Sequence, residues 1–423
     1  MTQDTPLSQI EVAFVGCLVP DEAEFQTAAF SRAGWLFQYN FLKSLLRAGM
    51  TISLVLSARP VPSFTRGPLT WFKSRVAHIE GLGAIHLLAF LNVTPLKQLL
   101  LGLCVVIQLV KWRWRMGRAR FLVVYTYNLS VPPATFLLFG CWLIRAKCLA
   151  LINDIDVPGH TVPRTLLFRI DFYIQKWCIG HLDGFSVISD AIAEDLGRNV
   201  PWLRMEGGVD QRIIDYNRDA EHRVGDPSKF TIVSAGSLDV ANGIRVILRA
   251  FASCPNRHYR LVIVGAGALE EEVRAAAGQD SRIEFRGYVA FRDVLSLYGT
   301  ADLVLNMRLT KVLNTRYFFP SKLIEALACG APVITTCTGH VEGELGELAF
   351  LLRDETEEGL ASLLRRVESL GPDVRETTGR RARAYMLKEK TWDRQGARVV
   401  EFLRARIVKG NRSSDVERHA SSR

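Results

Sequence analysis

The sequence predicts an α/β protein made of two doubly wound domains. In both halves of the chain, short apolar stretches typical of buried parallel strands alternate with amphipathic helical stretches. This alternation stops once, near the middle, and then begins again. A length of 423 residues is sufficient for two domains of ordinary size. We therefore expect one domain over residues 1–210 and a second over residues 211–385.

The first half begins with a predicted strand at Ile10–Val15, which leads through a loop to a helix near Trp35–Ala48. Strands that alternate with helices form a parallel sheet with helices on both faces. The remaining predicted elements of this half are strands at Thr51–Leu56, Phe121–Tyr125, Cys148–Ile152 and Gly184–Ser189, and helices at Pro133–Ile144 and Asp190–Arg198.

A polar stretch at Tyr216–Lys229 separates the halves, and strand–helix alternation restarts after it. An amphipathic helix near Trp392–Ile407 closes the pattern, and residues 409–423 are predicted to be disordered. The second half has predicted strands at Phe230–Gly236, Tyr259–Gly267, Arg282–Val289 and Ala301–Met307, and predicted helices at Ile244–Cys254, Leu269–Gly278 and Arg292–Thr300.

The stretch Phe319–Thr336, "FPSKLIEALACGAPVITT", predicts a helix, a turn and a buried strand. Ser321 is the expected N-cap, and Gly330 suits the left-handed position after the helix. Pro332 prevents the helix from continuing. The apolar face of the helix consists of Leu323, Ile324, Leu327 and Ala328.

Composition narrows the classes of partner. The formal net charge of +10 and the pI of about 9.3 favour nucleic acid, phosphate-bearing substrates or an anionic membrane as partner. A basic surface without a dedicated partner is the alternative. The eight cysteines show no paired metal spacing, so we expect reduced core cysteines in a cytosolic protein. The N-terminus lacks a basic region followed by a long apolar run, so no signal peptide is expected.

Two apolar runs, Leu99–Val110 and Val131–Ile144, are shorter than the ~20 residues that a membrane-spanning helix needs. The segment Leu99–Arg120 places a basic, tryptophan-bearing stretch directly after an apolar one. This pattern is typical of a helix lying on an anionic bilayer, but a buried helix with a basic exposed end fits equally. The residues concerned are Lys111, Arg113, Arg115, Arg118 and Arg120, with Trp112 and Trp114 among them.

The order of motifs in the second half resembles the family-4 (group 1) retaining glycosyltransferases of the GT-B fold. The resemblance extends over nearly the whole chain. It rests on "GSLDVANG" after the first strand, "GAG" after the next, "FRGYV", and above all "FPSKLIEALACGAPVI". It implies two Rossmann-like domains facing a cleft, an acceptor domain followed by a donor domain. It also implies a C-terminal helix, residues 386–408, that returns to the first domain.

A nucleotide-sugar donor presents a diphosphate, which helix N-termini, backbone N–H groups and cations bind. Lys322 at the start of the predicted helix suits a phosphate. The resemblance implies that Glu325 holds the ribose hydroxyls. The predicted catalytic residues are Lys322, Glu325 and Asp154. The predicted donor-binding residues are Gly34, Gly236, Ser237, Asn242, Gly243, Tyr288, Val289, Arg308, Arg316, Ser321 and Leu323.

Some positions depart from the family pattern. Tyr317 stands where the family commonly has a second glutamate, and Ser237 and Asn242 stand where it commonly has an arginine and a lysine. Branches with an "FPSK" motif use this "GSL…NG" pattern, so the sequence resembles such a branch. Asp154 follows a strand as a candidate catalytic aspartate, although a loop-capping role is the alternative. Glu270 replaces the third glycine of a dinucleotide fingerprint, which argues against a hydride cofactor.

The predicted function is therefore a metal-independent, retaining glycosyltransferase that needs no cofactor beyond its nucleotide-sugar donor. The expected acceptor is a saccharide or a lipid-linked saccharide of surface polysaccharide synthesis. The expected location is cytoplasmic, with peripheral attachment to the inner face of the plasma membrane. Two alternatives are a nucleotide-sugar epimerase and a non-catalytic protein that binds nucleotide sugars or membranes. Nucleic acid is not an expected partner, because it fits the charge but not the order of motifs.

Overall fold

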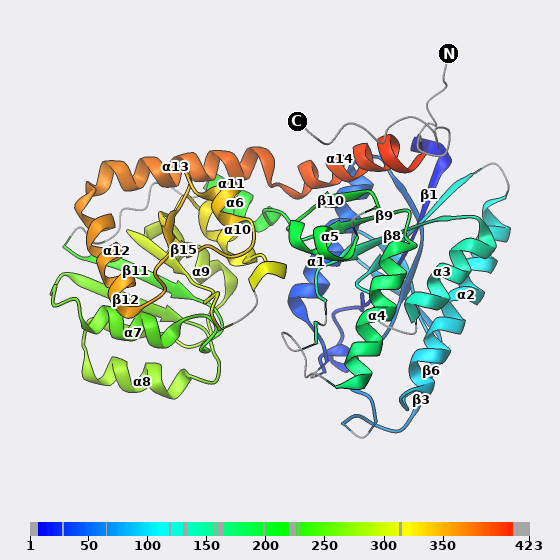
Figure 1. Ribbon diagram of the computed structural model, residues 1–423, viewed down its shortest axis with the longest axis horizontal. Coiled ribbons are helices and arrows are strands. Elements are labelled where there is room, and N and C mark those ends of the chain that lie inside the picture. Colours follow the sequence, from blue (N-terminus) through cyan, green and yellow to red (C-terminus); the bar gives the residue numbers. More distant parts are fainter. Residues whose placement is uncertain are drawn as a thin grey trace, which may run out of the picture. The chain divides into compact units, whose positions relative to one another are not determined.

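The computed structural model describes residues 7–27, 29–64, 66–117, 120–129, 133–155, 157–158, 165–197, 199–219, 226, 228–312 and 315–408. The chain forms two compact units (Figure 1). The first comprises Met1–Ile188, Ile192–Met205 and Trp392–Arg423, and the second comprises Ser189–Ala191 and Glu206–Thr391. The predicted boundary after residue 210 lies a few residues beyond the division after Met205. The tail at 409–423, for which disorder is predicted, lies outside the described residues.

The first unit contains an eight-stranded sheet in the order β10–β9–β8–β7–β1–β2–β5–β4. All neighbours are parallel except β4 and β5, which pair antiparallel at one edge. Strands β3 (Trp71–Phe72) and β6 (Phe90–Leu91) form a separate two-stranded antiparallel sheet. The strands are β1 (Ile10–Gly16), β2 (Thr51–Ser57), β4 (Arg75–Ile79), β5 (Gly83–Leu87), β7 (Phe121–Tyr127), β8 (Lys147–Ile152), β9 (Gly184–Val187) and β10 (Trp202–Arg204).

Helices cover both faces of this sheet. The connections through α2 (Leu96–Met116), α3 (Pro133–Ile144) and α4 (Leu166–Gly180) step across the sheet in one direction, and right-handed crossovers therefore place these three helices on one face. The connection through α1 (Arg32–Arg47) steps the opposite way. Helix α14 (Trp392–Phe402) packs on α1, so the C-terminal helix belongs to the first unit. The short helix α5 (Asp190–Leu196) follows β9.

The second unit is built on a six-stranded, fully parallel sheet in the order β13–β12–β11–β14–β15–β16. Its strands are β11 (Phe230–Ala235), β12 (Tyr259–Val264), β13 (Ile283–Phe285), β14 (Leu303–Asn306), β15 (Val333–Thr336) and β16 (Phe350–Leu352). Its helices are α6 (Gln211–Asp219), α7 (Ile244–Ala252), α8 (Glu270–Gln279), α9 (Phe291–Thr300), α10 (Ser321–Ala328), α11 (Val341–Leu345), α12 (Glu357–Ser369) and α13 (Gly371–Glu389). Two apolar clusters pack against the two faces of the sheet. The prediction of two doubly wound domains is confirmed.

The start of α10 differs from the prediction. Pro320 is the N-cap, with an extended backbone and no capping side chain, and Ser321 is already the first helical residue. The reason is that Pro320 fixes its own φ angle and ends the preceding extended segment, so the helix begins directly after it. The hydroxyl of Ser321 therefore does not cap the helix, and the residue is exposed. Gly330 has the expected left-handed conformation, with φ of +81°.

Among the described residues, no helix has the length and hydrophobicity that crossing a bilayer requires. The segment Leu99–Arg120 lies mainly in α2, and the interpretation that both of its tryptophans reach a membrane surface is wrong. Trp112 is buried, and its indole N–H donates to the hydroxyl of Ser53 at 2.9 Å. Trp114, by contrast, is 81% exposed. Arg120 pairs with Glu11 at 3.2 Å, and Arg118 lies outside the described residues.

Candidate functional site

The candidate donor site lies at the carboxyl edge of the second sheet, where loops from neighbouring strands approach closely. Gly236 follows β11 and Gly265 follows β12. A Cβ atom added to Gly265 would lie 1.8 Å from the carbonyl oxygen of Gly236, and Gly265 has φ of +141°. Only glycine therefore fits at position 265. The two turns bring backbone groups to the edge at which ligands of parallel sheets bind.

Lys322 extends from the first turn of α10 toward the turn after β11. Its Nζ atom lies 3.1 Å from the position that a Cβ atom of Gly236 would take. Partial enclosure by the protein lowers the pKa of Lys322, and the charge of Glu325 opposes this shift. Among the described residues, Lys322 has no ion-pair partner. A positive charge and a helix N-terminus thus point to the same place as the glycine turn, which favours an anionic ligand.

Glu325 lies one turn further along α10 and is half-buried. Burial raises the pKa of its carboxyl to about 7; the Lys322 and Arg212 charges oppose the shift, and Asp210 adds to it. Its side chain makes no hydrogen bond or ion pair with any residue that the structure describes. A half-buried carboxyl group without a protein partner is costly, and donors from a ligand would reduce that cost.

Arg308 connects the loops that follow β14 and β11. Its guanidinium donates to Oδ1 of Asn242 at 3.2 Å and lies 5.3 Å from the ring centroid of Phe318. The amide of Asn242 donates in turn to Asp239 at 3.0 Å and to the carbonyl oxygen of Ser237 at 3.2 Å. A cation from the loop after β14 thus reaches Asn242, where the resembling family commonly has a cation of its own.

The other predicted donor residues are placed as follows. Gly243 is the left-handed N-cap of α7, with φ of +68°. Tyr288 is 87% exposed, and Val289 is half-buried beside it. Arg316 is exposed in a short 3₁₀ turn. Leu323 is fully buried and donates its N–H to the carbonyl oxygen of Pro320, so neither its side chain nor its amide is available to a ligand.

The two predicted site residues of the first unit lie at the carboxyl edge of its own sheet. Gly34 is near the start of α1, and a Cβ atom there would lie 3.2 Å from the hydroxyl of Tyr127. Asp154 follows β8, is exposed, and accepts a hydrogen bond from Asn128 at 3.3 Å. Burial raises the pKa of Tyr127, and the charge of Asp154 adds to this. The structure therefore gathers Gly34, Tyr127 and Asp154 into one region of this unit.

A buried charged cluster in the second unit has no counterpart in the sequence analysis, because its members lie far apart in the chain. Nζ of Lys390 lies 3.0 Å from Glu206 and 2.5 Å from Glu344, and Nε2 of His340 lies 2.9 Å from Glu206. Burial opposes ionisation of Glu206, but the hydrogen bond from His340 and the charge of Lys390 outweigh it and lower its pKa to about 2. The two glutamates and the histidine have suitable metal-ligand atoms, but Lys390 already supplies the positive charge there.

The cluster supports the candidate site through one contact. The ring of His340 stacks on Phe319, with centroids 5.1 Å apart, and Phe319 immediately precedes the N-cap of α10. The hydrogen bond of His340 to Glu206 fixes the orientation of its ring. The buried cluster thereby holds the entry to α10, and with it the position of Lys322.

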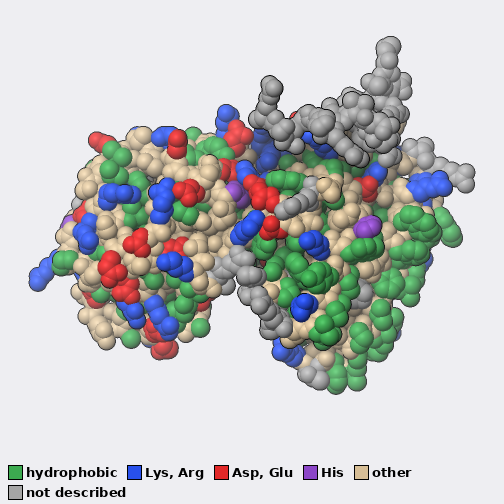
Figure 2. Space-filling model, in the orientation of Figure 1, with side chains coloured by type: hydrophobic (Ala, Val, Ile, Leu, Met, Phe, Trp, Pro, Cys, Tyr) green, Lys and Arg blue, Asp and Glu red, His purple; other side chains and the backbone are tan. Residues whose placement is uncertain are grey.

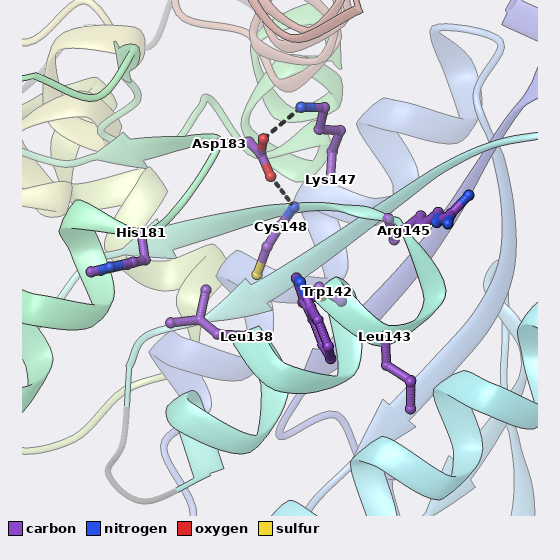
Figure 3. A pocket seen from close by; sticks show the side chains of 10 residues that line it. Leu138, Trp142, Leu143, Arg145, Lys147, Cys148, His181 and Asp183 are labelled. Atoms are coloured by element: carbon purple, nitrogen blue, oxygen red, sulfur yellow. Dashed lines mark hydrogen bonds and ion pairs between the residues drawn. The ribbon is translucent and has the colours of Figure 1, made fainter. Parts of the chain in front are cut away.

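A pocket of about 650 Å³ lies elsewhere, in the first unit (Figure 3). It is lined by residues near the amino end of β8, including Trp142, Arg145, Lys147 and Asp183. Lys147 pairs with Asp183 at 2.7 Å, and Asp183 also accepts from the amide of Cys148 at 2.9 Å. The pocket is lined by none of the predicted site residues. Its position at the amino edge of the sheet is the opposite of the edge where ligands of such sheets bind.

The raised pKa of Glu325 makes a prediction about stability. In the unfolded chain this carboxyl titrates near 4.5, whereas in the folded protein its pKa is about 7. Folding is therefore favoured by this group below pH 4.5, and that contribution is lost as the pH rises through 7. We expect Glu325→Gln to raise the free energy of unfolding by roughly 1–3 kcal/mol at pH 8 and to change it little at pH 4. Urea denaturation at both pH values measures this.

The exposed Glu376 is a matched control, because Glu376→Gln should change the free energy of unfolding little at either pH. A loss of stability in Glu325→Gln at pH 8 would mean that the carboxylate has a stabilising protein partner, contrary to the geometry described above.

Comparison with known proteins agrees with this geometry. Residues 229–369 match the family described as Glycosyl transferases group 1. A putative colanic acid biosynthesis glycosyltransferase, WcaL, from Salmonella typhimurium is 25% identical over 272 residues, which are 62% of this chain and 66% of that protein. WcaL from Escherichia coli is 24% identical over 249 residues, 57% of this chain and 60% of that protein. The matched parts thus span less than two thirds of each relative.

Among solved structures, Anabaena HepE in complex with UDP is similar, with a TM-score of 0.64 and 14% identity. The match covers 93% of this chain and 99% of HepE. An identity of this size shows the fold alone. Residues 229–369 of the second unit therefore match the family of the group 1 glycosyltransferases, and the chain has the GT-B fold.

Proposed function

We propose that this protein is a retaining glycosyltransferase that moves a sugar from a nucleoside diphosphate to an acceptor hydroxyl. The observation that carries the proposal is the convergence of Lys322, Arg308 and Glu325 on one edge of the second sheet. Two cations and the start of α10 suit a diphosphate, and an unpartnered carboxylate suits the hydroxyls of a ribose. The family match and the complex of HepE with UDP support the same class of ligand.

The chemistry that we propose needs positioned charge rather than a nucleophile from the protein. The bond between the sugar C1 and the phosphate oxygen breaks, and a bond from C1 to the acceptor oxygen forms on the same face of the sugar. The departing diphosphate takes the acceptor proton. Lys322 and Arg308 stabilise the negative charge that develops on the diphosphate, and preorganised charges of this kind lower the barrier efficiently. No metal ion takes part in this scheme.

The proposed acceptor is a saccharide, free or lipid-linked, of surface polysaccharide assembly. The two curated relatives are described as putative colanic acid biosynthesis enzymes, which supports this substrate class. The first unit supplies the acceptor side, with Asp154 and Gly34 at the carboxyl edge of its sheet. We infer a cytoplasmic location, and membership of the branch with the "FPSK" motif rests on the sequence pattern alone.

The reaction is tested by incubating the protein with UDP-, GDP- and ADP-sugars, with and without a lipid-linked saccharide acceptor. We expect release of the nucleoside diphosphate from one donor class, faster with acceptor and unchanged by EDTA. We also expect the donor's anomeric configuration in the product, as read by NMR. Conversion of the sugar without release of nucleotide would indicate an epimerase. Binding without any turnover would indicate a non-catalytic protein and would overturn the proposal.

The role of Glu325 predicts a pH-dependent affinity. Two ribose hydroxyls can both donate strong hydrogen bonds to Glu325 only when its carboxyl group is ionised, because protonation turns one oxygen into a donor. The pKa of this group without ligand is about 7. The affinity of the wild type for its nucleotide sugar should therefore rise about tenfold from pH 6 to pH 8. Glu325→Gln should bind at least about tenfold more weakly at pH 8, since each hydrogen bond to a charged group is worth roughly 1.5–3 kcal/mol.

Calorimetry with the intact nucleotide sugar measures this, because that ligand has no phosphate group titrating near neutral pH. The pH dependence should be absent from Glu325→Gln. An affinity that is independent of pH in the wild type and unchanged in the variant would remove Glu325 from the site.

If Lys322 and Arg308 bind the diphosphate through their charge, a cation at a neighbouring position should be able to replace one of them. Lys322→Ala and Arg308→Ala should each weaken nucleoside diphosphate binding by about tenfold or more and leave nucleoside binding nearly unchanged. Because Arg308 contacts Asn242, a lysine at position 242 can supply the missing charge. We therefore expect Arg308→Ala combined with Asn242→Lys to recover most of the lost affinity. Calorimetry with the diphosphate and the nucleoside compares the variants.

Arg292→Ala is the matched control, because Arg292 is exposed on α9 of the same unit and has no partner among the described residues. If diphosphate and nucleoside lose affinity equally, or if Asn242→Lys restores nothing, Arg308 does not act through phosphate charge.

A further inference from the structure

The outer face of the helical layer formed by α2, α3 and α4 is unusually apolar. Figure 2 shows hydrophobic side chains gathered over these helices of the first unit. Trp142 is 72% exposed and Leu167 is 79% exposed. Exposed apolar patches larger than a few hundred Å² mark interaction sites in soluble proteins. The exposed large apolar residues of this layer are Leu96, Leu99, Leu103, Ile107, Trp114, Phe139, Trp142, Leu143, Leu166, Leu167, Ile170, Tyr173 and Trp177.

The spacing of these residues shows continuous stripes rather than isolated side chains. In α2, Leu99, Leu103 and Ile107 follow one another at four-residue steps, which places them on one face of the helix. The opposite face of α2 is also apolar and is buried against α3 and β6. A helix that is apolar on all sides is normally covered on all sides. No element among the described residues covers the outer stripe of α2.

The charges on this layer are almost all positive. Between residues 96 and 181 the sequence has 11 lysines and arginines but only three aspartates and glutamates, and it has none of the latter between 96 and 150. Lys111 lies four residues after Ile107, on the same stripe of α2. Five exposed cations of the layer have no ion-pair partner among the described residues. They are Lys111, Arg115, Arg145, Arg169 and Lys176.

Aromatic side chains lie at one end of the layer. The strands that α3 and α4 connect are parallel, so both helices run back toward the amino edge of the sheet, and α2 does the same between β5 and β7. Trp114, Trp142 and Trp177 each lie in the last turn or two of their helix. The three exposed tryptophans therefore share one end, and each has a basic residue nearby in sequence.

We propose that this face, defined by the exposed residues of α2, α3 and α4, docks on an anionic lipid bilayer. Apolar stripes that carry lysines and arginines suit the boundary between acyl chains and headgroups, where tryptophan also concentrates. The basic side chains extend to the phosphate layer while their methylene groups stay on the apolar surface. A protein partner would need an acidic, apolar counterpart, and the part of the layer that the structure describes, whose exposed charges are mainly basic, does not offer one to a second copy. The inference does not depend on the proposed transfer reaction.

Sedimentation of the full chain with phosphatidylcholine vesicles, with and without phosphatidylglycerol, tests the proposal. We expect binding to the anionic vesicles that falls as salt is raised from 50 to 500 mM, and about tenfold weaker binding to neutral vesicles. Replacing Lys111, Arg115, Arg169 and Lys176 with glutamine should weaken binding by about tenfold or more. The double variant Trp114→Ser/Trp142→Ser should weaken vesicle binding by a similar factor. Its effect should persist at high salt, because it removes apolar contacts rather than charge.

A matched control replaces exposed cations of the second unit, Arg257, Arg292 and Arg366, with glutamine, and it should bind vesicles like the wild type. Thermal unfolding of every variant checks that the exposed substitutions leave the fold intact. If the control loses as much vesicle binding as the layer variants, net charge alone accounts for binding, and the proposal is overturned. Absence of vesicle binding would also overturn it, as would a dimer in light scattering that the tryptophan variants abolish, since a second copy would then cover the face.

Discussion

The half-buried carboxyl group of Glu325, which has no protein partner, is the feature on which the candidate site depends. Burial favours its neutral form, whereas Lys322 one turn earlier favours the charged form, and the balance leaves its pKa near 7. A ligand that supplies hydroxyl donors to Glu325 and negative charge to Lys322 satisfies both groups at once. A half-buried, ionised Glu325 lowers the free energy of unfolding of the second unit at neutral pH, as is common where a site is preorganised.

The rest of the second unit keeps these two side chains in position. Leu323, Ile324 and Leu327 bury the inner face of α10 against the sheet, so the helix cannot rotate without exposing its core residues. The buried Glu206–His340–Glu344–Lys390 cluster adds a polar constraint at its start, through the stacking of His340 on Phe319. Such a cluster contributes little net stability, but its geometry is specific because an unpaired buried charge is costly.

The fold and the identity of the key helix are predictable from the sequence, because they rest on local patterns. The parallel strands are short, apolar and regularly spaced, and the prediction of a helix at Pro133–Ile144 agrees with α3 at both ends. Three features were not predictable. Pro320 is the N-cap that was expected to be Ser321, and helix α6 extends to Asp219, into the polar stretch that was predicted to separate the domains. The buried charged cluster joins Glu206 to Lys390, which are far apart in the chain. Each depends on contacts or backbone geometry beyond the local pattern.

The two readings of the segment Leu99–Arg120, a buried helix or a membrane-surface helix, prove to be compatible. One side of α2 is core, with Trp112 hydrogen-bonded inside the first unit, and the other side is an exposed apolar stripe that continues on α3 and α4. Sequence periodicity cannot separate two apolar faces of one helix, since both add to the same hydrophobic run. The structure separates the two faces of α2. A parallel sheet must be covered by apolar side chains, and this accounts for the buried face of α2 but not for its exposed stripe. The outer stripe thus has a cause other than folding, and the exposed cations beside it, which have no ion-pair partner among the described residues, fit the anionic bilayer that we propose.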